Sequence, residues 1–413
     1  MTPEKLYKYE IGLLSLLVLV LPSLEALKTF FWFSYLIIFL IRRFQNGSLS
    51  LMPKKSANIA VTLYLSAALI STLVNWPFDN GFKGFLDEFR FLTLFLCLYS
   101  AGYTEAEYRR IALLIVVGVL GGLAYGLVEF LFHFRTDFQF HSAGILTQSS
   151  IYLGISILVN AGLLLDKQPV PQKLTTFLRA SLLIQLVALV YMGSRGSMLA
   201  IILTFILLAI LTLRLRTVIA WLAGVGLSIL VISVLIQMFP DNIFSKDITT
   251  QYSVDRIKAS DSQRIEAWEV AFAKLAEGKD LVWGIGPRNY KAINDMEFVR
   301  QNDNLLQLRK YTHAHNLFLT QLIEQGIFGL FAMLYLFFLF LLKIISIWRL
   351  EPDHSPGWAW YGGVGGLAIP LVAGMFNTPF YQEHAMLAML VMGMMFAAAE
   401  RTSNDTHTLL QKS

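Results

Sequence analysis

Residues 311–347 read YTHAHNLFLTQLIEQGIFGLFAMLYLFFLFLLKIISI, and this stretch decides the fold class. Most of residues 315–347 are apolar, so a helix of this length can cross a hydrocarbon core ~30 Å thick. It begins with two histidines and an asparagine, which are polar side chains suited to a membrane–water boundary. The stretch therefore predicts a transmembrane helix with a polar group of residues at its start.

Similar apolar runs recur along the whole chain. Of its 413 residues, 56% are hydrophobic and 15% are charged, which is typical of a protein whose solvent is a lipid bilayer. We predict an all-α polytopic membrane protein with roughly twelve transmembrane helices. The predicted spans lie near residues 10–24, 27–44, 57–75, 86–102, 110–133, 142–165, 175–193, 197–213, 217–239, 315–347, 358–377 and 383–399.

The distribution of Lys and Arg predicts the orientation, because short cytoplasmic loops carry an excess of both. Alternate connections contain such residues, for example Arg42, Arg43, Arg109, Arg110 and Arg349. Both termini are therefore expected in the cytoplasm, and the one long connection is expected in the periplasm of a Gram-negative cell, outside its inner membrane. The predicted division is residues 1–239 as transmembrane helices 1–9, 240–312 as a periplasmic loop domain, 313–399 as helices 10–12, and 400–413 as a cytoplasmic tail.

The sequence also argues against a cleavable signal, an intramolecular disulfide and a nucleic-acid partner. The first apolar run lacks a small-residue cleavage site and is followed by a second helix, so no cleavable signal is expected. The only cysteine, Cys97, lies in a predicted span and cannot form an intramolecular disulfide. Membrane topology accounts for the net charge of +5, so no nucleic-acid partner is predicted.

The long outer connection is predicted to contain an amphipathic helix over residues 262–277, SQRIEAWEVAFAKLAE. Ser262 is its expected cap and Gly278 its expected end. Its apolar face is expected to lie on the membrane surface or on other periplasmic segments. The residues of that face are Ile265, Trp268, Phe272 and Leu275. A tight turn is predicted in the next stretch, LVWGIGPRNY.

Two arginines at the outer face are candidates for binding an anion. Arg195 lies between glycines in the short hairpin MGSRGSML, residues 192–199, where backbone and ligand can come close. Arg264 lies near the start of the predicted helix, where free N–H groups and a guanidinium could together hold a phosphate. Alternatives stay open: a snorkelling interfacial charge for Arg195, and an ordinary surface ion pair with Asp261 or Glu269 for Arg264.

The two histidines that open the quoted stretch are candidates for proton transfer. Imidazole is the side chain whose unperturbed pKa lies nearest neutral pH, so His313 and His315 suit acid/base or hydrogen-bonding roles. A polar anchor at the interface is the alternative. No further His or Cys cluster with ligand spacing and no D-x-D motif is present, so neither a metal nor another cofactor is predicted.

Three further cations at the outer face could contact phosphate or sugar, although an ordinary interfacial charge is the favoured interpretation of each. These residues are Lys83, Arg90 and Arg288.

The spacing of residues after the histidines resembles a known signature. His315 and Asn316 are followed after nine residues by Gly326 and two residues later by Gly329, with Glu324 just ahead of the glycines. This pattern resembles the H-N-x9-G-x-x-G signature of the O-antigen ligase family, which attaches O-antigen to lipid A-core. That family is related to O-antigen polymerases and bacterial O-oligosaccharyltransferases, and the resemblance implies a GT-C-like glycosyltransferase.

The resemblance also implies roles for individual residues. Arg195 matches the arginine of the hairpin before the eighth span, Arg264 matches the arginine of an R-x-x-x-W pattern, and His315 matches the family's essential histidine. The two arginines would bind the diphosphate of an undecaprenyl-diphosphate-linked O-antigen. His315 would be the general base that activates a lipid A-core hydroxyl, in a metal-independent reaction that inverts the anomeric configuration.

Neighbouring residues have more open roles. Asn316 or His313 could fix the tautomer of the imidazole or bind a sugar hydroxyl. Glu324 could orient His315 or pair with a polar group in the bundle. The rival enzymes are an O-antigen polymerase and a protein O-oligosaccharyltransferase, which differ only in the acceptor. A lipid or glycan transporter and a non-enzymatic assembly scaffold are rivals from other classes.

Overall fold

A computed structural model describes residues 2–47, 55–76, 80–142, 145–168, 170–212, 215–239, 242–293, 311–351, 356–380 and 383–412. These residues form helices and connecting segments, with no strand among them. The helices before the outer connection are α1 (Pro3–Val20), α2 (Glu25–Gln45), α3 (Lys55–Val74), α4 (Gly81–Ser100), α5 (Glu105–Leu131), α6 (Leu146–Leu165), α7 (Gln172–Met192), α8 (Arg195–Thr212) and α9 (Leu215–Met238). The later helices are α10 (Ile243–Gln251), α11 (Val254–Ala276), the short 3-10 helix η1 (Tyr290–Ala292), α13 (Leu317–Leu350), α14 (Trp358–Ala373) and α15 (Glu383–Lys412). Residues 294–310 of the predicted loop domain lie outside the described residues.

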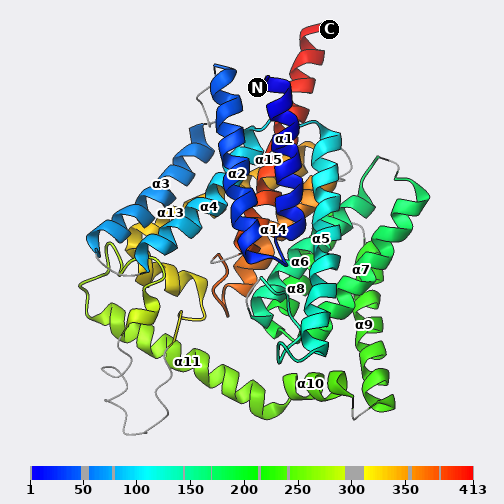
Figure 1. Ribbon diagram of the computed structural model, residues 1–413, viewed down its shortest axis with the longest axis vertical. Coiled ribbons are helices and arrows are strands. Elements are labelled where there is room, and N and C mark those ends of the chain that lie inside the picture. Colours follow the sequence, from blue (N-terminus) through cyan, green and yellow to red (C-terminus); the bar gives the residue numbers. More distant parts are fainter. Residues whose placement is uncertain are drawn as a thin grey trace.

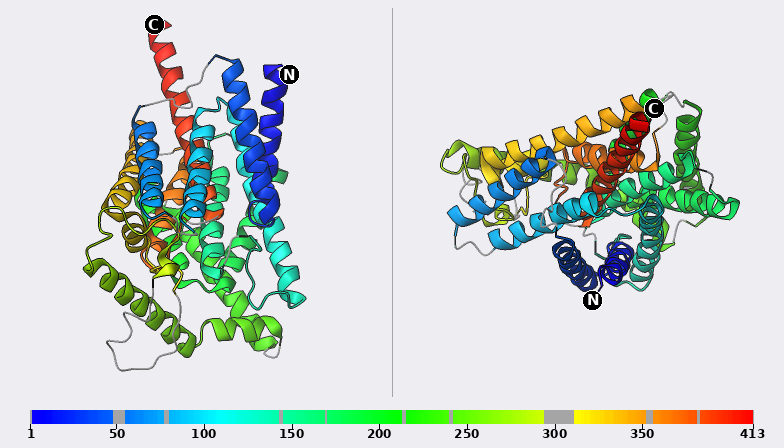
Figure 2. Two further views of the ribbon diagram at one scale, coloured as in Figure 1. Left: turned by 60° about the vertical axis from the view of Figure 1, so that its left-hand side comes forward. Right: turned by 90° about the horizontal axis from the view of Figure 1, so that it is seen from above.

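The two chain termini lie at the same end of the helix bundle, while α10 and α11 lie across the opposite end (Figures 1 and 2). Both termini are expected at one end when the number of membrane crossings between them is even, as in the predicted topology. Helix α15 runs through the predicted boundary at residue 400 as one helix to Lys412, and its C-terminal end projects beyond the other helices (Figure 1).

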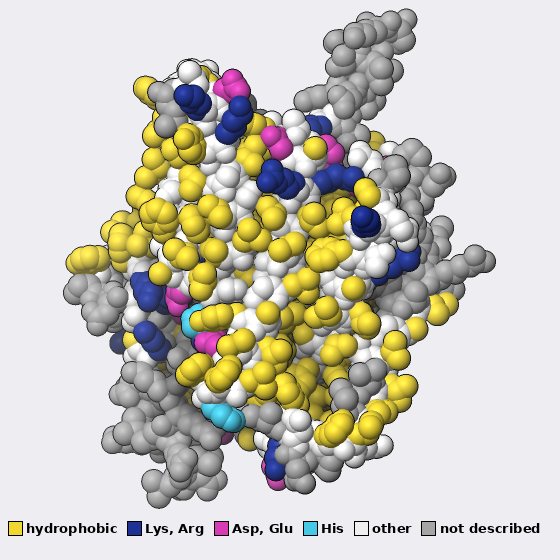
Figure 3. Space-filling model, turned by 45° about the vertical axis from the view of Figure 1, so that its right-hand side comes forward, with side chains coloured by type: hydrophobic (Ala, Val, Ile, Leu, Met, Phe, Trp, Pro, Cys, Tyr) yellow, Lys and Arg dark blue, Asp and Glu magenta, His cyan; other side chains and the backbone are white. Residues whose placement is uncertain are grey.

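Several helices are long and apolar enough to span a membrane. Among the described residues seven helices meet this condition, namely α3, α5, α6, α7, α8, α13 and α15, and α14 is a shorter apolar helix. The predicted multi-pass class is therefore confirmed, whereas the count of twelve stays a prediction. On the face drawn in Figure 3, hydrophobic side chains spread over most of the surface, and several Lys and Arg side chains gather near its upper end.

Helix α11 starts earlier than the sequence analysis predicted. It begins at Val254 and is capped by Ser253, whose side chain accepts a hydrogen bond from the N–H of Arg256. Ser262 lies inside the helix, so its predicted role as the cap was wrong. Arg264 consequently lies roughly three turns from the helix start. The argument that free N–H groups of the helix end assist this guanidinium was therefore also wrong, because those groups are confined to the first turn.

The buried face of α11 also differs from the prediction. Ile265 and Phe272 are 54% and 61% exposed, whereas Trp268 is partly buried and Leu275 packs against the buried cluster. A face of small residues is buried instead, because small side chains allow the loop after α11 and the start of α13 to approach closely. The buried cluster comprises Ala267, Val270, Ala271, Ile285, Tyr290, Ile293, Tyr311, Ala314 and Ile323. Protein segments, rather than the membrane, thus hold this face of α11.

Helix α13 is broken at Gly326, where φ is 67° and ψ is −168°. The break frees backbone groups that pair with the loop of residues 281–290, which we call the docking loop. Ile285 N–H donates to the carbonyl of Ile323 (2.9 Å), and Ile327 N–H donates to the carbonyl of Leu281 (2.9 Å). The docking loop therefore fills the gap in the hydrogen-bond ladder of α13.

Glycine is required on both sides of this contact. A Cβ built on Gly326 would lie 2.1 Å from the carbonyl oxygen of Val282, and one on Gly284 would lie 2.3 Å from the carbonyl carbon of Glu324. Both glycines also have positive φ, which L side chains rarely adopt. The first glycine of the H-N-x9-G-x-x-G pattern thus has a clear structural role, which is to admit the docking loop.

We expect Gly326→Ala to destabilise the protein by about 2–4 kcal/mol, because the methyl group meets backbone and the conformation favours glycine. The measurement is thermal unfolding of the purified protein in detergent. Gly121→Ala in α5 is the matched control, since a Cβ there meets nothing within 4 Å. Equal melting temperatures for Gly326→Ala and the wild type would show that the docked loop does not need this glycine.

Candidate active site

The structure brings Arg195 and Arg264 together around one carboxylate. Arg195 begins α8, and its Nη2 and Nη1 lie 2.9 Å and 3.3 Å from the two oxygens of Asp261 on α11. Arg264 Nη1 lies 2.9 Å from Oδ1 of the same carboxylate. We call these three residues the arginine clamp. A phosphate can use the same paired donors as a carboxylate, so the clamp has the geometry of an anion site.

Electrostatics within the clamp favour an anion between the guanidinium groups. Hydrogen bonding from Arg195, assisted by the charge of Arg264, lowers the pKa of Asp261 below its usual value. Burial and the neighbouring charge of Arg195 lower the pKa of Arg264. The two guanidinium cations repel each other, and the carboxylate between them offsets that repulsion. A phosphate in the same place would offset it equally well. The side chain of Asp261 is about half exposed, so the anion position between the two guanidinium groups is open to solvent.

His315 precedes α13 and has an unusual backbone conformation. Its φ of 49° lies in the left-handed region, which residues other than glycine seldom adopt. Hydrogen bonds on both sides hold it there: Ala314 N–H donates to Oγ1 of Thr320 (3.1 Å), and Leu317 N–H donates to the carbonyl of Gly374 (2.7 Å). Strain of this kind, held by surrounding structure, is common at functional sites.

The imidazoles of His313 and His315 meet edge to face, with ring centroids 4.3 Å apart. Nδ1 of His313 accepts a hydrogen bond from the backbone N–H of His315 (3.2 Å), so His313 helps to fix the conformation of its neighbour. Burial, followed by the nearby charge of Arg264, lowers the pKa of His315 to about 4. Burial, followed by the charge of His315, lowers the pKa of His313 to about 3. Both rings are therefore neutral at pH 7, and His315 lies within electrostatic reach of the arginine clamp.

Asn316 is the N-cap of α13. Its side-chain oxygen accepts from Leu319 N–H (3.0 Å), and its Nδ2 donates to the carbonyl of Met375 (3.2 Å). These contacts tie the start of α13 to the end of α14. The structure thus gives Asn316 a structural role, and its predicted contact with the imidazole or with a sugar stays untested.

Glu324 is buried and holds the docking loop. Its Oε2 accepts from the N–H of Arg288 (2.9 Å), and its Oε1 accepts from the N–H of Tyr290 (3.2 Å). These partners belong to the docking loop, and both predicted roles of Glu324 stay predictions.

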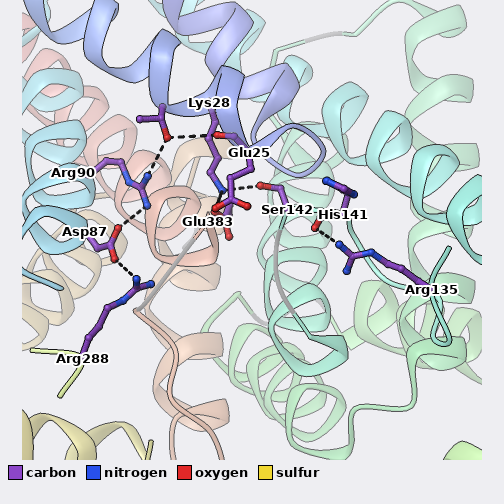
Figure 4. A network of polar contacts seen from close by, with 10 residues as sticks. Glu25, Lys28, Asp87, Arg90, Arg135, His141, Ser142, Arg288 and Glu383 are labelled. Carbon is purple, nitrogen blue, oxygen red and sulfur yellow. Dashed lines mark hydrogen bonds and ion pairs between the residues drawn. The ribbon is translucent and has the colours of Figure 1, made fainter. Parts of the chain in front are cut away.

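The weaker candidates gather at a second place. Asp87 on α4 lies between Arg90 and Arg288: Arg90 Nη2 is 3.0 Å from Oδ1, and Arg288 Nη1 is 2.9 Å from Oδ2 (Figure 4). Lys83 is exposed one turn earlier on α4. The sequence analysis missed Asp87, although its spacing of three residues from Arg90 on a helix was a usable signal.

A further ion pair in the same region also escaped the sequence analysis. Lys28 on α2 and Glu383 at the start of α15 are both buried and paired, and Lys28 Nζ also donates to Oγ of Ser142 (2.7 Å) (Figure 4). The partners are 355 residues apart, so no local pattern could have paired them.

Metal binding has no candidate site in the part of the chain that the structure describes. No group of three or more His, Cys, Asp or Glu side chains there is arranged to hold a metal ion. The predicted metal independence is a statement about the reaction, and it stays a prediction.

The clamp, the docking loop and His315 all fall within one segment that extends from α7 into α13. Residues 180–334 match the family model described as O-antigen ligase. The resemblance predicted from the His315 signature is thereby confirmed for this segment. The O-antigen ligase match supports a glycosyltransferase of the O-antigen ligase or polymerase type. It contains every predicted site residue except Lys83 and Arg90, which lie before it. No curated protein matches the chain.

Proposed function

We propose that this protein is an O-antigen ligase of the Gram-negative inner membrane. It would transfer a glycan from undecaprenyl diphosphate to a hydroxyl of lipid A-core at the periplasmic face, with both termini in the cytoplasm. One observation carries the proposal: Arg195 and Arg264 share a single carboxylate, and Arg264 is close enough to His315 to lower its pKa. An anion site and a neutral base at one face of the membrane are what this transfer requires.

The arginine clamp would bind the donor diphosphate. In this mechanism the diphosphate displaces Asp261 and accepts the paired N–H donors of Arg195 and Arg264. Negative charge grows on the leaving diphosphate as the bond between sugar and phosphate breaks. Guanidinium groups that are already in position stabilise that charge, so no divalent cation is needed in this scheme.

His315 would act as the general base. Its neutral imidazole takes the proton of the acceptor hydroxyl while the acceptor oxygen forms a bond to the anomeric carbon. The bond between that carbon and the diphosphate oxygen breaks, and its electron pair leaves with undecaprenyl diphosphate. A direct displacement of this kind inverts the anomeric configuration.

The pH dependence follows from the environment of His315. In the free enzyme its pKa is about 4, so kcat/KM for the donor should stay constant down to roughly pH 5 and fall below it. A bound diphosphate favours the imidazolium form, which raises the pKa and makes His315 a stronger base at neutral pH. The acid limb of the kcat profile should therefore lie at higher pH than that of kcat/KM. A kcat/KM limb centred near the ordinary histidine value of ~6.5 would contradict this assignment.

The acceptor is tested with purified protein and lipid-linked O-antigen. Three acceptors are compared: rough lipopolysaccharide, a second lipid-linked unit, and pilin. Transfer to lipopolysaccharide alone supports the ligase, whereas products with either of the others favour a polymerase or a protein oligosaccharyltransferase. Each reaction is repeated with EDTA, and loss of transfer on chelation would overturn metal independence.

A further inference from the structure

A groove of about 510 Å³ opens at the end of the bundle away from the termini. It lies between the last turn of α5, the loop that follows this helix, and the pair of helices α10 and α11 (Figure 1). We call it the α5–α10 groove. Its volume falls in the range of ligand sites, roughly 300–1,000 Å³. The charged and imidazole side chains that line it are His133, Arg135, Asp137, Lys246, Asp247 and Arg256.

One wall of the groove is a fixed turn at the end of α5. The N–H groups of His133 and Phe134 donate to carbonyls in the last turn of the helix (3.1 Å and 2.9 Å), which is the bonding of a Schellman motif. His133 has a φ of 59° at the position of this motif where glycine is usual. Arg135 Nη2 donates to the carbonyl of His141 (2.9 Å) and so closes the loop (Figure 4). The turn would suit glycine, yet it carries an exposed imidazole that lines the groove.

The other wall is α10 with the start of α11. Phe244 on α10 packs on Phe130 at the end of α5, with ring centroids 5.3 Å apart. Asp247, also on α10, accepts a hydrogen bond from the hydroxyl of Tyr191 on α7 (2.9 Å). Contacts within the protein therefore hold both walls, so the groove is formed before a ligand arrives.

The lining of the groove presents hydrogen-bond donors and acceptors together. Three of its side chains are cations and two are carboxylates, and such a near balance of charge disfavours a polyanion or a polycation as the ligand. Asp137 and Arg256 lie 3.4 Å apart, and their side chains are 28% and 41% exposed, so both can accommodate another partner. A hydroxyl donates one hydrogen bond and accepts others. The lining therefore suits a neutral ligand with many hydroxyls, which is a sugar.

The α5–α10 groove lies next to the arginine clamp. Asp137 accepts from Nε2 of Gln251 at the end of α10 (3.1 Å). A Cβ built on Gly193 would lie 3.4 Å from Cβ of Gln251, so one side chain separates the groove from the hairpin that carries Arg195. On α11, Arg256 precedes the carboxylate of the clamp by about 7.5 Å along the helix axis. A glycan whose diphosphate lies in the clamp would therefore reach the groove within its first few sugars.

We propose that the α5–α10 groove binds sugars of the donor glycan beyond the one attached to the diphosphate. This inference rests on the proposed transfer from a lipid-linked donor. The lining residues His133, Lys246 and Arg256 are exposed, so a chain longer than the groove can extend past them into solvent. Contacts here lie away from the bond that breaks, so they stabilise the bound donor and the transition state equally. Their effect is to lower donor KM without changing kcat.

The test compares two undecaprenyl-diphosphate-linked donors that differ only in glycan length. One carries a single sugar, which is too short for the groove, and the other carries several repeat units. We expect the wild type to have a donor KM roughly tenfold lower for the long glycan, because a few hydrogen bonds to hydroxyls contribute a factor of this order.

Two substitutions should remove this advantage of the long donor. His133→Gly deletes the imidazole and places glycine where the Schellman motif favours it, and Arg256→Gln deletes a guanidinium. Each should raise the KM of the long donor by roughly threefold, and the double variant should raise it to the value of the short donor. The KM of the short donor and both kcat values should stay unchanged. Lys258→Gln is the matched control, since Lys258 is exposed on the same helix and does not line the groove.

A binding measurement separates the groove from the arginine clamp without turnover. The free oligosaccharide of the same repeat units, without lipid or diphosphate, is titrated calorimetrically into purified protein in detergent. The wild type and Arg195→Ala should bind it equally, because it has no diphosphate for the clamp to hold. The double groove variant should not bind it.

Three results would overturn the inference. The first is an equal donor KM of the wild type for the short and the long glycan. The second is undiminished binding of the free oligosaccharide by the double variant. The third is a rise in acceptor KM with donor KM unchanged, which would assign the groove to the acceptor. If the wild type transfers nothing from either donor, the proposed function itself fails and the inference with it, and that outcome differs from all three because no KM can then be measured.

Discussion

His315→Ala should reduce glycan transfer by roughly 10²–10⁴-fold while the protein remains folded, because a positioned general base contributes about that factor. The imidazole is neutral at pH 7 and its ring is not part of the hydrogen bonds that hold the turn before α13. Its removal should therefore affect chemistry more than stability. The measurements are transfer to rough lipopolysaccharide by purified protein, the O-antigen ladder in cells, and thermal unfolding.

His313→Asn is the matched control for this substitution. A ring nitrogen of His313 accepts from the N–H of His315, and an asparagine oxygen can accept the same bond, so the substitution keeps this bond and removes the edge-to-face contact of the two rings. We expect this variant to keep its activity within about tenfold of the wild type. A full O-antigen ladder in a His315→Ala strain would show that His315 is not the general base.

The general architecture could be predicted because it depends on local properties of the chain. Apolar runs, the outer helix and the glycine pattern after His315 are each visible in short windows of sequence. The position of the docking loop could not be predicted, since it needs the break at Gly326, and the pattern alone does not show which segment fills that break.

The errors on α11 have a physical origin. Large apolar side chains dominate any assignment of a helix face, but the tightest packing here uses Ala267, Val270 and Ala271. Small residues bury little area each, yet they allow a close approach of backbones. Ser253, which lies before the predicted boundary, caps the helix, so the helix starts earlier than predicted. Arg264 is therefore too far from the helix end to share its free N–H groups.

The candidate site was only partly accessible from sequence. Arg195, Arg264 and His315 were named from their residue types and from the resemblance, and the structure gathers the two arginines on Asp261. Asp261 had been considered only as an ordinary surface partner for Arg264. Its bridging position depends on the start of α8 lying near α11, which no local pattern encodes.

Arg195→Ala and Arg264→Ala should each lower transfer by about 10²–10³-fold, because each removes donors from the developing charge of the diphosphate. Lysine should not rescue either position well, since a single ammonium lacks the paired N–H donors of a guanidinium. The double variant should lose less than the product of the two single losses, because both arginines act on one group. The measurements are kcat and donor KM with purified protein.

Asp261→Asn is the control that distinguishes a substrate clamp from a structural ion pair. If the carboxylate only stabilises the contact between α8 and α11, its loss should lower the melting temperature and impair transfer, as loss of either arginine would. If Asp261 instead occupies the place of the diphosphate, the variant should bind donor more tightly and lower its KM, because a competing anion has gone. Inorganic pyrophosphate should then inhibit Asp261→Asn at lower concentration than the wild type. Weaker pyrophosphate inhibition of Asp261→Asn, together with full transfer by Arg195→Ala, would show that the clamp does not bind diphosphate.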